Sequence, residues 1–200
     1  TGSLFWERDL EVLIRVAPVL RGSSLIVGDG RGGIRGLRLA DGQETWRDSV
    51  ESGVRARPLV GSEHIWLGTA AGQIIALDGA TGVQQWQVDI GGLPTGEMAS
   101  TEGVLGVGTA DRSVYGIEAS TGTVRWAFKT EGVVRGGPAA GAGVFYVGSS
   151  DGHLYALDAS NGDLLWKFRL DGPVLEGISW VGETLVVATE KKILYAFDRR

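Results

Sequence analysis

Arginines recur at one place in a repeated pattern of this 200-residue sequence, and they are the residues best suited to bind a ligand. Arg15, Arg55 and Arg135 each stand three residues before a proline. A guanidinium group stays charged at any accessible pH and holds a carboxylate or phosphate through paired N–H donors. Mutual pairing of arginine with glutamate in the same segments is the alternative, purely structural role. The candidate ligand site defined by these segments comprises Arg15, Arg55, Arg57, Arg135, Glu97 and Glu176.

Other residues with catalytic potential are scattered over the repeat. His64 and His153 stand at different repeat positions, so they are not expected to share a metal ion or to form a catalytic pair. Asp78, Asp158 and Asp198 do share one position. An Asp just before a turn commonly hydrogen-bonds the local backbone, however, and we interpret these side chains as structural.

A glycine-rich stretch, residues 28–33, resembles a phosphate-binding loop in composition. It joins two expected strands, so the helix N-terminus that would hold a phosphate is missing. The chain has no cysteine, which excludes thiolate chemistry and disulfides. A formal charge of -5 gives no support for binding nucleic acid or a membrane. The sequence therefore predicts no catalytic, cofactor or metal site.

A tryptophan recurs every 40 residues and divides the chain into five copies of one unit. These residues are Trp6, Trp46, Trp86, Trp126 and Trp166. A fixed period in this range is typical of architectures in which each unit stacks on its neighbours. Residues 193–200 match the first part of the motif that ends at Trp166, and residues 1–9 match its second part. We therefore expect a ring in which the N-terminal strand completes the last unit.

Each unit contains four short strands and no expected helix. In the fourth copy, two runs rich in β-branched and aromatic residues, 144–148 and 153–158, flank an Asp-Gly turn, which is a strong hairpin signal. A third strand is expected over 163–169 and a fourth around 138–140. Four antiparallel strands in every 40 residues predict an all-β, five-bladed β-propeller that forms one domain over residues 1–200.

A column of small residues crosses the middle of one strand in every copy. Glycine inside a strand weakens it unless another group approaches its backbone closely. We expect the approaching group to be an aromatic ring from the adjacent blade. The column consists of Gly28, Gly68, Gly108, Gly148 and Ala188.

The stretch from Ala76 to Trp86 reads Ala-Leu-Asp-Gly-Ala-Thr-Gly-Val-Gln-Gln-Trp, which resembles the tryptophan-docking motif of the PQQ-like β-propeller repeats. The stretch 156–166 nearly repeats it, whereas Arg38 and Glu118 replace the Asp of the motif in the first and third copies. The resemblance covers the whole chain. It implies that each Trp stacks on the Gly peptide of a neighbouring motif.

The resemblance implies a fold and leaves the activity open. In the quinoprotein dehydrogenases of this family, the quinone cofactor depends on eight blades, a bound calcium ion and a vicinal cysteine pair. This sequence has five repeats and no cysteine, so no cofactor is expected. Five uniform repeats are consistent with an engineered or selected small propeller, with a natural one, or with chains that assemble into a larger ring.

We therefore expect a non-catalytic binding or scaffold module, monomeric, with a protein or a small anion as its partner at the mouth of the central channel. The alternative is a fragment of an extracytoplasmic sensor, an outer-membrane assembly lipoprotein or a quinoprotein whose activity lies outside this chain. The resemblance implies an extracytoplasmic location for a natural protein of this kind.

Overall fold

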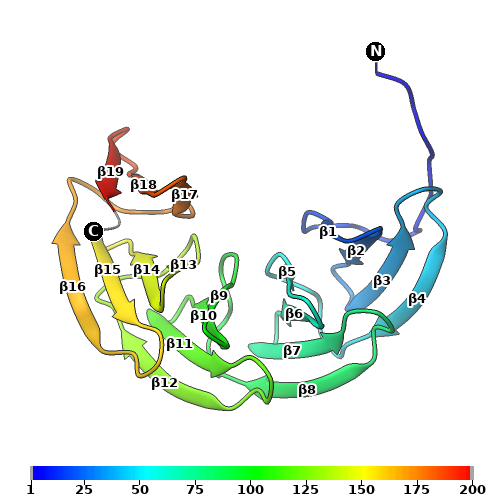
Figure 1. Cartoon of the computed structure of the whole chain (residues 1–200), viewed down its shortest axis with the longest axis horizontal. Helices are drawn as coiled ribbons and strands as arrows, with labels where there is room; N and C mark the ends of the chain where they lie inside the picture. Colours follow the sequence, from blue (N-terminus) through cyan, green and yellow to red (C-terminus); the bar gives the residue numbers. More distant parts are fainter. Residues whose placement is uncertain (1, 199–200) are drawn as a thin grey trace. The chain divides into compact units, whose positions relative to one another are not determined.

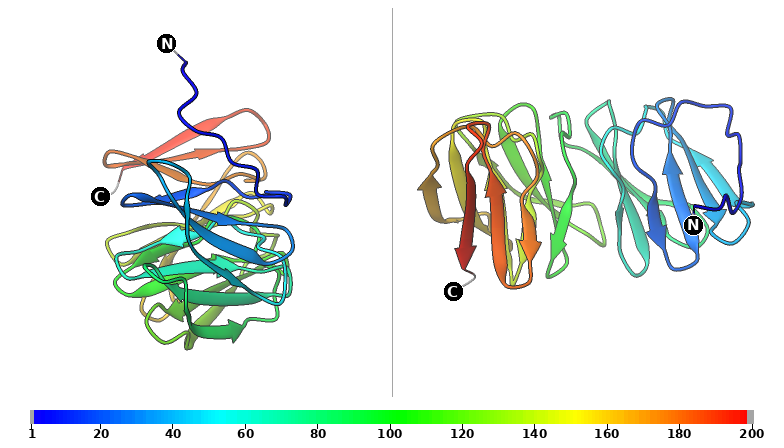
Figure 2. Two further views of the ribbon diagram at one scale, coloured as in Figure 1. Left: turned by 90° about the vertical axis from the view of Figure 1, so that its right-hand side faces the viewer. Right: turned by 90° about the horizontal axis from the view of Figure 1, so that it is seen from above.

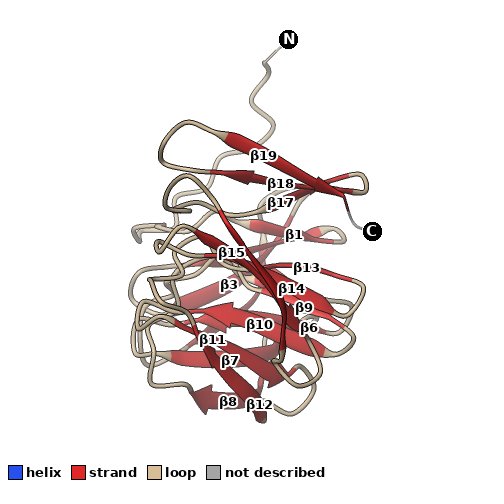
Figure 3. Ribbon diagram, turned by 90° about the vertical axis from the view of Figure 1, so that its left-hand side faces the viewer, coloured by secondary structure: helices blue, strands red, loops and turns tan. Residues whose placement is uncertain are grey.

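The computed structural model describes residues 2–198, which form five antiparallel sheets. Four sheets have four strands and the last has three. No helix occurs among the described residues (Figure 3). Within this same part of the chain, no helix is long and apolar enough to cross a membrane. The expectation of an all-β chain is confirmed.

The strands of each sheet follow one another along the chain (Figure 1). The first sheet consists of β1 (Val19–Arg21), β2 (Ser24–Gly28), β3 (Gly33–Arg38) and β4 (Glu44–Ser49). The second consists of β5 (Leu59–Val60), β6 (His64–Gly68), β7 (Gln73–Asp78) and β8 (Gln84–Asp89). The third consists of β9 (Ala99–Thr101), β10 (Val104–Gly108), β11 (Ser113–Glu118) and β12 (Val124–Lys129). The fourth consists of β13 (Ala139–Gly141), β14 (Val144–Gly148), β15 (His153–Asp158) and β16 (Leu164–Arg169). The fifth consists of β17 (Ser179–Val181), β18 (Thr184–Ala188) and β19 (Leu194–Asp198).

The chain groups into two compact units, which are described separately. Unit 1 (Thr1–Gln87) has its core between the first two sheets, where Ile26 and Ile34 pack with Ile65, and all three are fully buried. Unit 2 (Val88–Arg200) has two such cores, one between its first and second sheets and one between its second and third. Figure 2 shows the sheets of each unit from two further sides. Stacking of neighbouring sheets thus supplies the burial that one short sheet lacks.

Three of the repeated tryptophans lie against a glycine of the next sheet in their own unit. The Nε1 atom of Trp126 donates to the carbonyl of Ala159 at 2.9 Å, and a Cβ built on Gly162 would lie 2.6 Å from the indole ring. Trp6 contacts Gly42 in the same way, and Trp46 contacts Gly82. These glycines have φ values between 69° and 78°, a region that side chains rarely adopt. Each therefore supplies a bare peptide surface for the ring.

The small-residue column is approached by valine, and the expectation of an aromatic ring is wrong there. A Cβ on Gly28 would lie 3.0 Å from the side chain of Val54. Val134 approaches Gly108 and Val174 approaches Gly148 in the corresponding places. The valine comes from the segment that precedes the next sheet, so this column fixes that segment rather than the tryptophan.

The last sheet contains three strands, and the expected closure of a ring is not shown. Residues 2–9 form no strand, and β19 has β18 as its neighbour in the described part of the chain. Trp6 instead fixes its segment to the first sheet, donating to the carbonyl of Leu39 at 2.8 Å. Residues 199 and 200 of the expected final stretch lie outside the described residues.

Candidate functional site

Alternating burial in the segment before β5 directs its arginines outward. Val54 and Ala56 are each only 3% exposed, whereas Arg55 and Arg57 are exposed. The backbone is fixed at two points, because the N–H of Val54 donates to the carbonyl of Asp29 at 3.1 Å and that of Arg55 donates to Gly68 at 2.8 Å. The extended backbone then places the two arginines on the side opposite the buried residues.

Arg15 is held by the equivalent segment of the first repeat. Ile14 forms an isolated bridge with Asp29, and the N–H of Gly30 donates to the carbonyl of Leu13 at 3.3 Å. The stem of Arg15 crosses Gly30 so closely that a Cβ there would lie 3.3 Å from its Cδ and Nε atoms. Larger residues occupy this position in the other repeats, namely Ala70, Ala110, Ser150 and Glu190.

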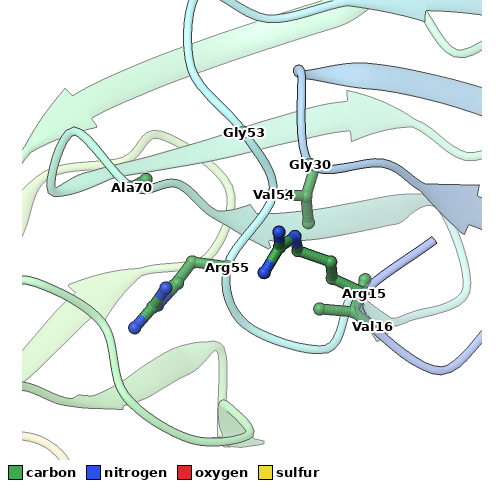
Figure 4. Close-up of a pocket in the computed structure, with 7 residues that line it drawn as sticks. All are labelled: Arg15, Val16, Gly30, Gly53, Val54, Arg55 and Ala70. Carbon is green, nitrogen blue, oxygen red and sulfur yellow. The ribbon is translucent and has the colours of Figure 1, made fainter. Parts of the chain in front are cut away.

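Arg15 and Arg55 line one pocket of ≈ 470 Å³ in unit 1 (Figure 4). In Figure 4 the side chain of Arg15 reaches toward Arg55, and the side chain of Arg55 points away from Arg15. The residues that line this pocket include no carboxylate. Within the described part of the chain, neither guanidinium group forms an ion pair or hydrogen bond. Arg15 also borders a second pocket of ≈ 490 Å³, to which Asp9 and Glu11 contribute acidic groups. The first pocket is therefore the positively charged one.

The other candidate residues lie elsewhere. Arg57 is exposed and is not among the residues that line either pocket of Arg15. Glu97, Arg135 and Glu176 line one pocket of ≈ 370 Å³ in unit 2. Three of the six candidates thus lie in unit 1 and three in unit 2. In unit 1 the structure brings Arg15 and Arg55 into one pocket, and in unit 2 it brings all three candidates into one pocket.

The pocket of unit 2 has a floor of closely packed backbone. A Cβ on Gly136 would collide with the backbone of Glu176, and one on Gly137 would collide with Glu97. Arg135 and Glu176 form no ion pair with each other among the described residues. With two glutamates and one arginine, this pocket carries mixed charge, in contrast to the pocket of Arg15 and Arg55.

A partly buried polar cluster around Asp151 was not predicted from the sequence. One oxygen of Asp151 accepts from the hydroxyls of Ser149 and Tyr155, at 2.8 and 2.9 Å, and the other lies 3.0 Å from Nδ1 of His153. Burial acts to raise the pKa of Asp151, but these hydrogen bonds outweigh it and hold the pKa below its usual value. Burial, together with Asp151, raises the pKa of Tyr155. The cluster ties a hairpin turn together.

The sequence does contain a signal for such clusters, although it is visible only across the repeats. Every copy carries a polar residue directly after its second strand, and all five are buried. They are Asp29, Thr69, Thr109, Ser149 and Thr189. Their side chains or backbones hydrogen-bond the turn that follows, as the Asp29 carboxylate does with the N–H groups of Arg31 and Gly33. Among the described residues, no three His, Cys, Asp or Glu side chains gather in a way that could hold a metal ion.

Comparison with known proteins gives one family and several similar folds. The profile of the family described as "Outer membrane protein assembly factor BamB" matches residues 1–126 and 110–200. BamB from Moraxella catarrhalis is 24% identical with a TM-score of 0.82, over 92% of this chain and 57% of that chain. No curated protein sequence matches the chain.

Two further structures extend the comparison. The computationally designed protein Ika8 is 17% identical with a TM-score of 0.79, over 90% of this chain and 57% of that one. The quinohemoprotein alcohol dehydrogenase from Comamonas testosteroni is 15% identical with a TM-score of 0.77, over 94% and 42%. The chain therefore spans little more than half the length of BamB and Ika8. At these identities the structural likeness establishes a shared β-propeller fold.

Proposed function

The chain belongs to the family of the outer membrane protein assembly factor BamB, and we propose that it is a non-catalytic β-propeller module that binds a partner. The partner presents a carboxylate or phosphate group, either as a small anion or on the surface of a protein. The pocket of Arg15 and Arg55 receives this group.

The observation that carries the proposal is a pair of arginines without an acidic partner in one pocket. Each guanidinium can donate two parallel N–H bonds to one anionic group. The backbone at Arg55 is fixed by buried Val54 and by hydrogen bonds, and the backbone at Arg15 is fixed by the bridge between Ile14 and Asp29, so binding has to order only the side chains. Both groups are exposed, so solvent and salt weaken their attraction to an anion. Affinity for one small anion is on the order of 1 mM, which corresponds to about 4 kcal/mol.

Support for a non-catalytic role comes from the side chains with potential chemistry. His153, Ser149 and Tyr155 all bond the carboxylate of Asp151, which is thereby fully occupied within its own hairpin. His64 instead stacks on Trp66 with ring centroids 5.8 Å apart. Among the described residues, no hydrogen bond joins either histidine to a hydroxyl group that it could activate.

A role in assembly is the second candidate, and family membership favours it over the quinoprotein alternative. The family is described as an outer membrane protein assembly factor, and this chain covers 57% of one such protein. We propose that such a module acts as a scaffold outside the cytoplasm, as part of a larger protein or as an engineered propeller like its designed structural neighbour.

The finer architecture is also a proposal. We propose that the five sheets are the blades of one monomeric propeller, and that residues 3–8 form the fourth strand of the last sheet. If numbering continues from Arg200 to Thr1, the interval from Asp198 to Trp6 equals that from Asp158 to Trp166. The segment therefore has the correct register to lie beside β19 as β16 lies beside β15.

Calorimetric titration with phosphate, sulfate and citrate at low ionic strength tests the binding site. We expect saturable binding that weakens as salt rises, and a loss of about tenfold or more in affinity for Arg15→Ala and for Arg55→Ala. Arg135→Ala is the matched control, because it removes the same side chain from the pocket of mixed charge. Unchanged binding in the first two variants would show that the anion does not occupy this pocket.

A further inference from the structure

The last sheet exposes a strand edge that is covered in the sheet before it. There, β15 lies between β14 and β16, whereas β19 has only β18 beside it among the described strands. Leu194 of β19 is 68% exposed, while its counterpart Leu154 in β15 is fully buried. From Leu194 to Ala196, this edge thus presents backbone donors and acceptors that face no second strand among the described residues, together with an exposed apolar side chain, which is the usual template for strand addition.

Trp166, next to this edge, lacks the cover that its counterpart has. Trp126 packs against Gly162 and is 8% exposed, whereas Trp166 is 39% exposed. Counting on from Arg200 to Thr1, the next glycine of the repeat column is Gly2. A strand that carries Gly2 into this place would cover the indole ring.

Residues 2–8 form no strand and pair with no sheet in the part of the chain that the structure describes. They have the sequence of a fourth strand, yet Leu4 is 78% and Phe5 is 83% exposed. The counterparts in the paired strand β16, Leu164 and Leu165, are 43% and 50% exposed. Pairing with a sheet edge would therefore cover a substantial part of both apolar side chains.

We infer that the free edge of β19 is a strand-acceptor surface for residues 2–8 of a second copy of this chain. The inference rests on the pairing proposed above and adds exchange of that strand between copies. A chain's own segment competes with that of the second copy, at an effective concentration set by the folded chain that joins it to β19. Exchange therefore becomes prominent at high protein concentration, or where a chain's own segment cannot pair.

The pairs of β15 with β16 define which backbone groups would meet. Ala156 pairs with Trp166 and Leu154 with Phe168, so Ala196 would pair with Trp6, and Leu194 with Arg8. The N–H of Asp158 donates toward β16, and alternate residues of a strand donate to the same side. By this equivalence, the N–H of Ala196 points away from β18 toward the free edge. The N–H of Arg8 would point toward the carbonyl group of Leu194.

Two proline variants separate the donor from the acceptor. Ala196→Pro prevents pairing at the edge of β19 and leaves residues 2–8 able to pair. Arg8→Pro prevents pairing by residues 2–8 and leaves the edge of β19 intact. Both act because proline has no backbone N–H. Glu7→Pro is the matched control, since its N–H points away from the acceptor. Molar mass is measured by light scattering on each variant and on equimolar mixtures over a range of protein concentrations.

Each variant alone is expected to be monomeric, and an equimolar mixture of Ala196→Pro with Arg8→Pro is expected to contain two-chain complexes and nothing larger. The mean molar mass of the wild-type chain should rise with protein concentration. The double variant, Arg8→Pro with Ala196→Pro, should form no complex with Arg8→Pro. A synthetic peptide of residues 1–9 should bind Arg8→Pro, which gives a second readout if Ala196→Pro fails to fold.

The exchange and the pairing on which it rests fail in different ways. Absence of both the mixed complex and peptide binding, with Arg8→Pro less stable than Glu7→Pro, would overturn exchange and leave pairing within one chain intact. Equal stability of Arg8→Pro and Glu7→Pro would overturn the pairing itself.

Discussion

Replacing Gly162 with alanine tests how the tryptophan joins neighbouring sheets of unit 2. Gly162 has a φ of 78°, where alanine costs about 1 kcal/mol. The added methyl would lie 2.6 Å from the Trp126 ring, and such overpacking costs a further 1–3 kcal/mol or so. We therefore expect a loss of about 2–4 kcal/mol in the free energy of unfolding.

Gly103 provides a matched control because its φ is 77° and its nearest neighbour would lie 3.9 Å from an added Cβ. Gly103→Ala should cost only the backbone term of about 1 kcal/mol. Trp126→Ala should cost about 3–5 kcal/mol, because the ring is 8% exposed and its Nε1 bonds Ala159. In that background, Gly162→Ala should fall to about 1 kcal/mol, since the clash is gone.

Urea unfolding followed by circular dichroism measures all four chains of this cycle without depending on tryptophan fluorescence. The slopes against urea should agree, so that differences in midpoint report stability alone. The same cost for Gly162→Ala in both backgrounds would refute the packing of Trp126 on Gly162, because no coupling between the two residues would remain.

Three further predictions concern single side chains. The pKa of Asp151 is held low in the folded chain, so the ionised carboxylate stabilises the fold above its ordinary pKa of about 4, and this stabilisation is lost as pH falls below that value. The difference in unfolding free energy between wild type and Asp151→Asn, measured by urea unfolding at several pH values, should therefore shrink in acid. A constant difference would contradict this. Arg21 donates to the carbonyls of Gly79 and Ser62 from the first sheet to the second, so Arg21→Met should cost about 2 kcal/mol in the same assay, and a neutral change would show that this clamp contributes nothing. Gly30→Ala should displace the stem of Arg15 and weaken phosphate binding severalfold with little change in melting temperature, whereas unaltered affinity would mean that the stem need not cross Gly30.

The strands were predictable because their signals are local. The runs 144–148 and 153–158 became β14 and β15 with the expected bounds, since period-two patterning and the Asp-Gly turn act within a few residues. Gly152 has a φ of 83° at that turn. The repeat then carries the same prediction to the other sheets, where Arg112 and Lys192 adopt positive φ values without being glycine. Local sequence preference is overridden there by the surrounding hairpin.

Contacts between sheets were predicted less well, because repeat spacing alone does not say which elements meet. Gly28 and its equivalents are small because a valine such as Val54 approaches them closely. The tryptophans pack instead against the glycines of the turns. Both kinds of glycine repeat every 40 residues, so the spacing could not distinguish them. The difference arises from φ, which is positive at Gly162 and not at Gly28.

The candidate site was predictable in part for the same reason. Arg15 and Arg55 share a repeat position in adjacent sheets, and this places them in one pocket. No carboxylate lines this pocket, and that depends on where long, flexible side chains lie and on the space that Gly30 leaves for the stem of Arg15. The repeat pattern specifies neither of these. The cluster of Asp151 was missed because its four polar residues look unremarkable one at a time, and burial alone makes them a network.

Side-chain nuclear magnetic resonance of isotope-labelled arginine tests the proposed binding site most directly. During titration with phosphate at low ionic strength, the Nε–H signals of Arg15 and Arg55 should shift together along one binding curve, assigned through the Arg15→Ala and Arg55→Ala chains. The signal of Arg135 should move little, because glutamates share its pocket. Uniform small shifts of all exposed arginines, or a shift confined to Arg135, would contradict an anion site at Arg15 and Arg55.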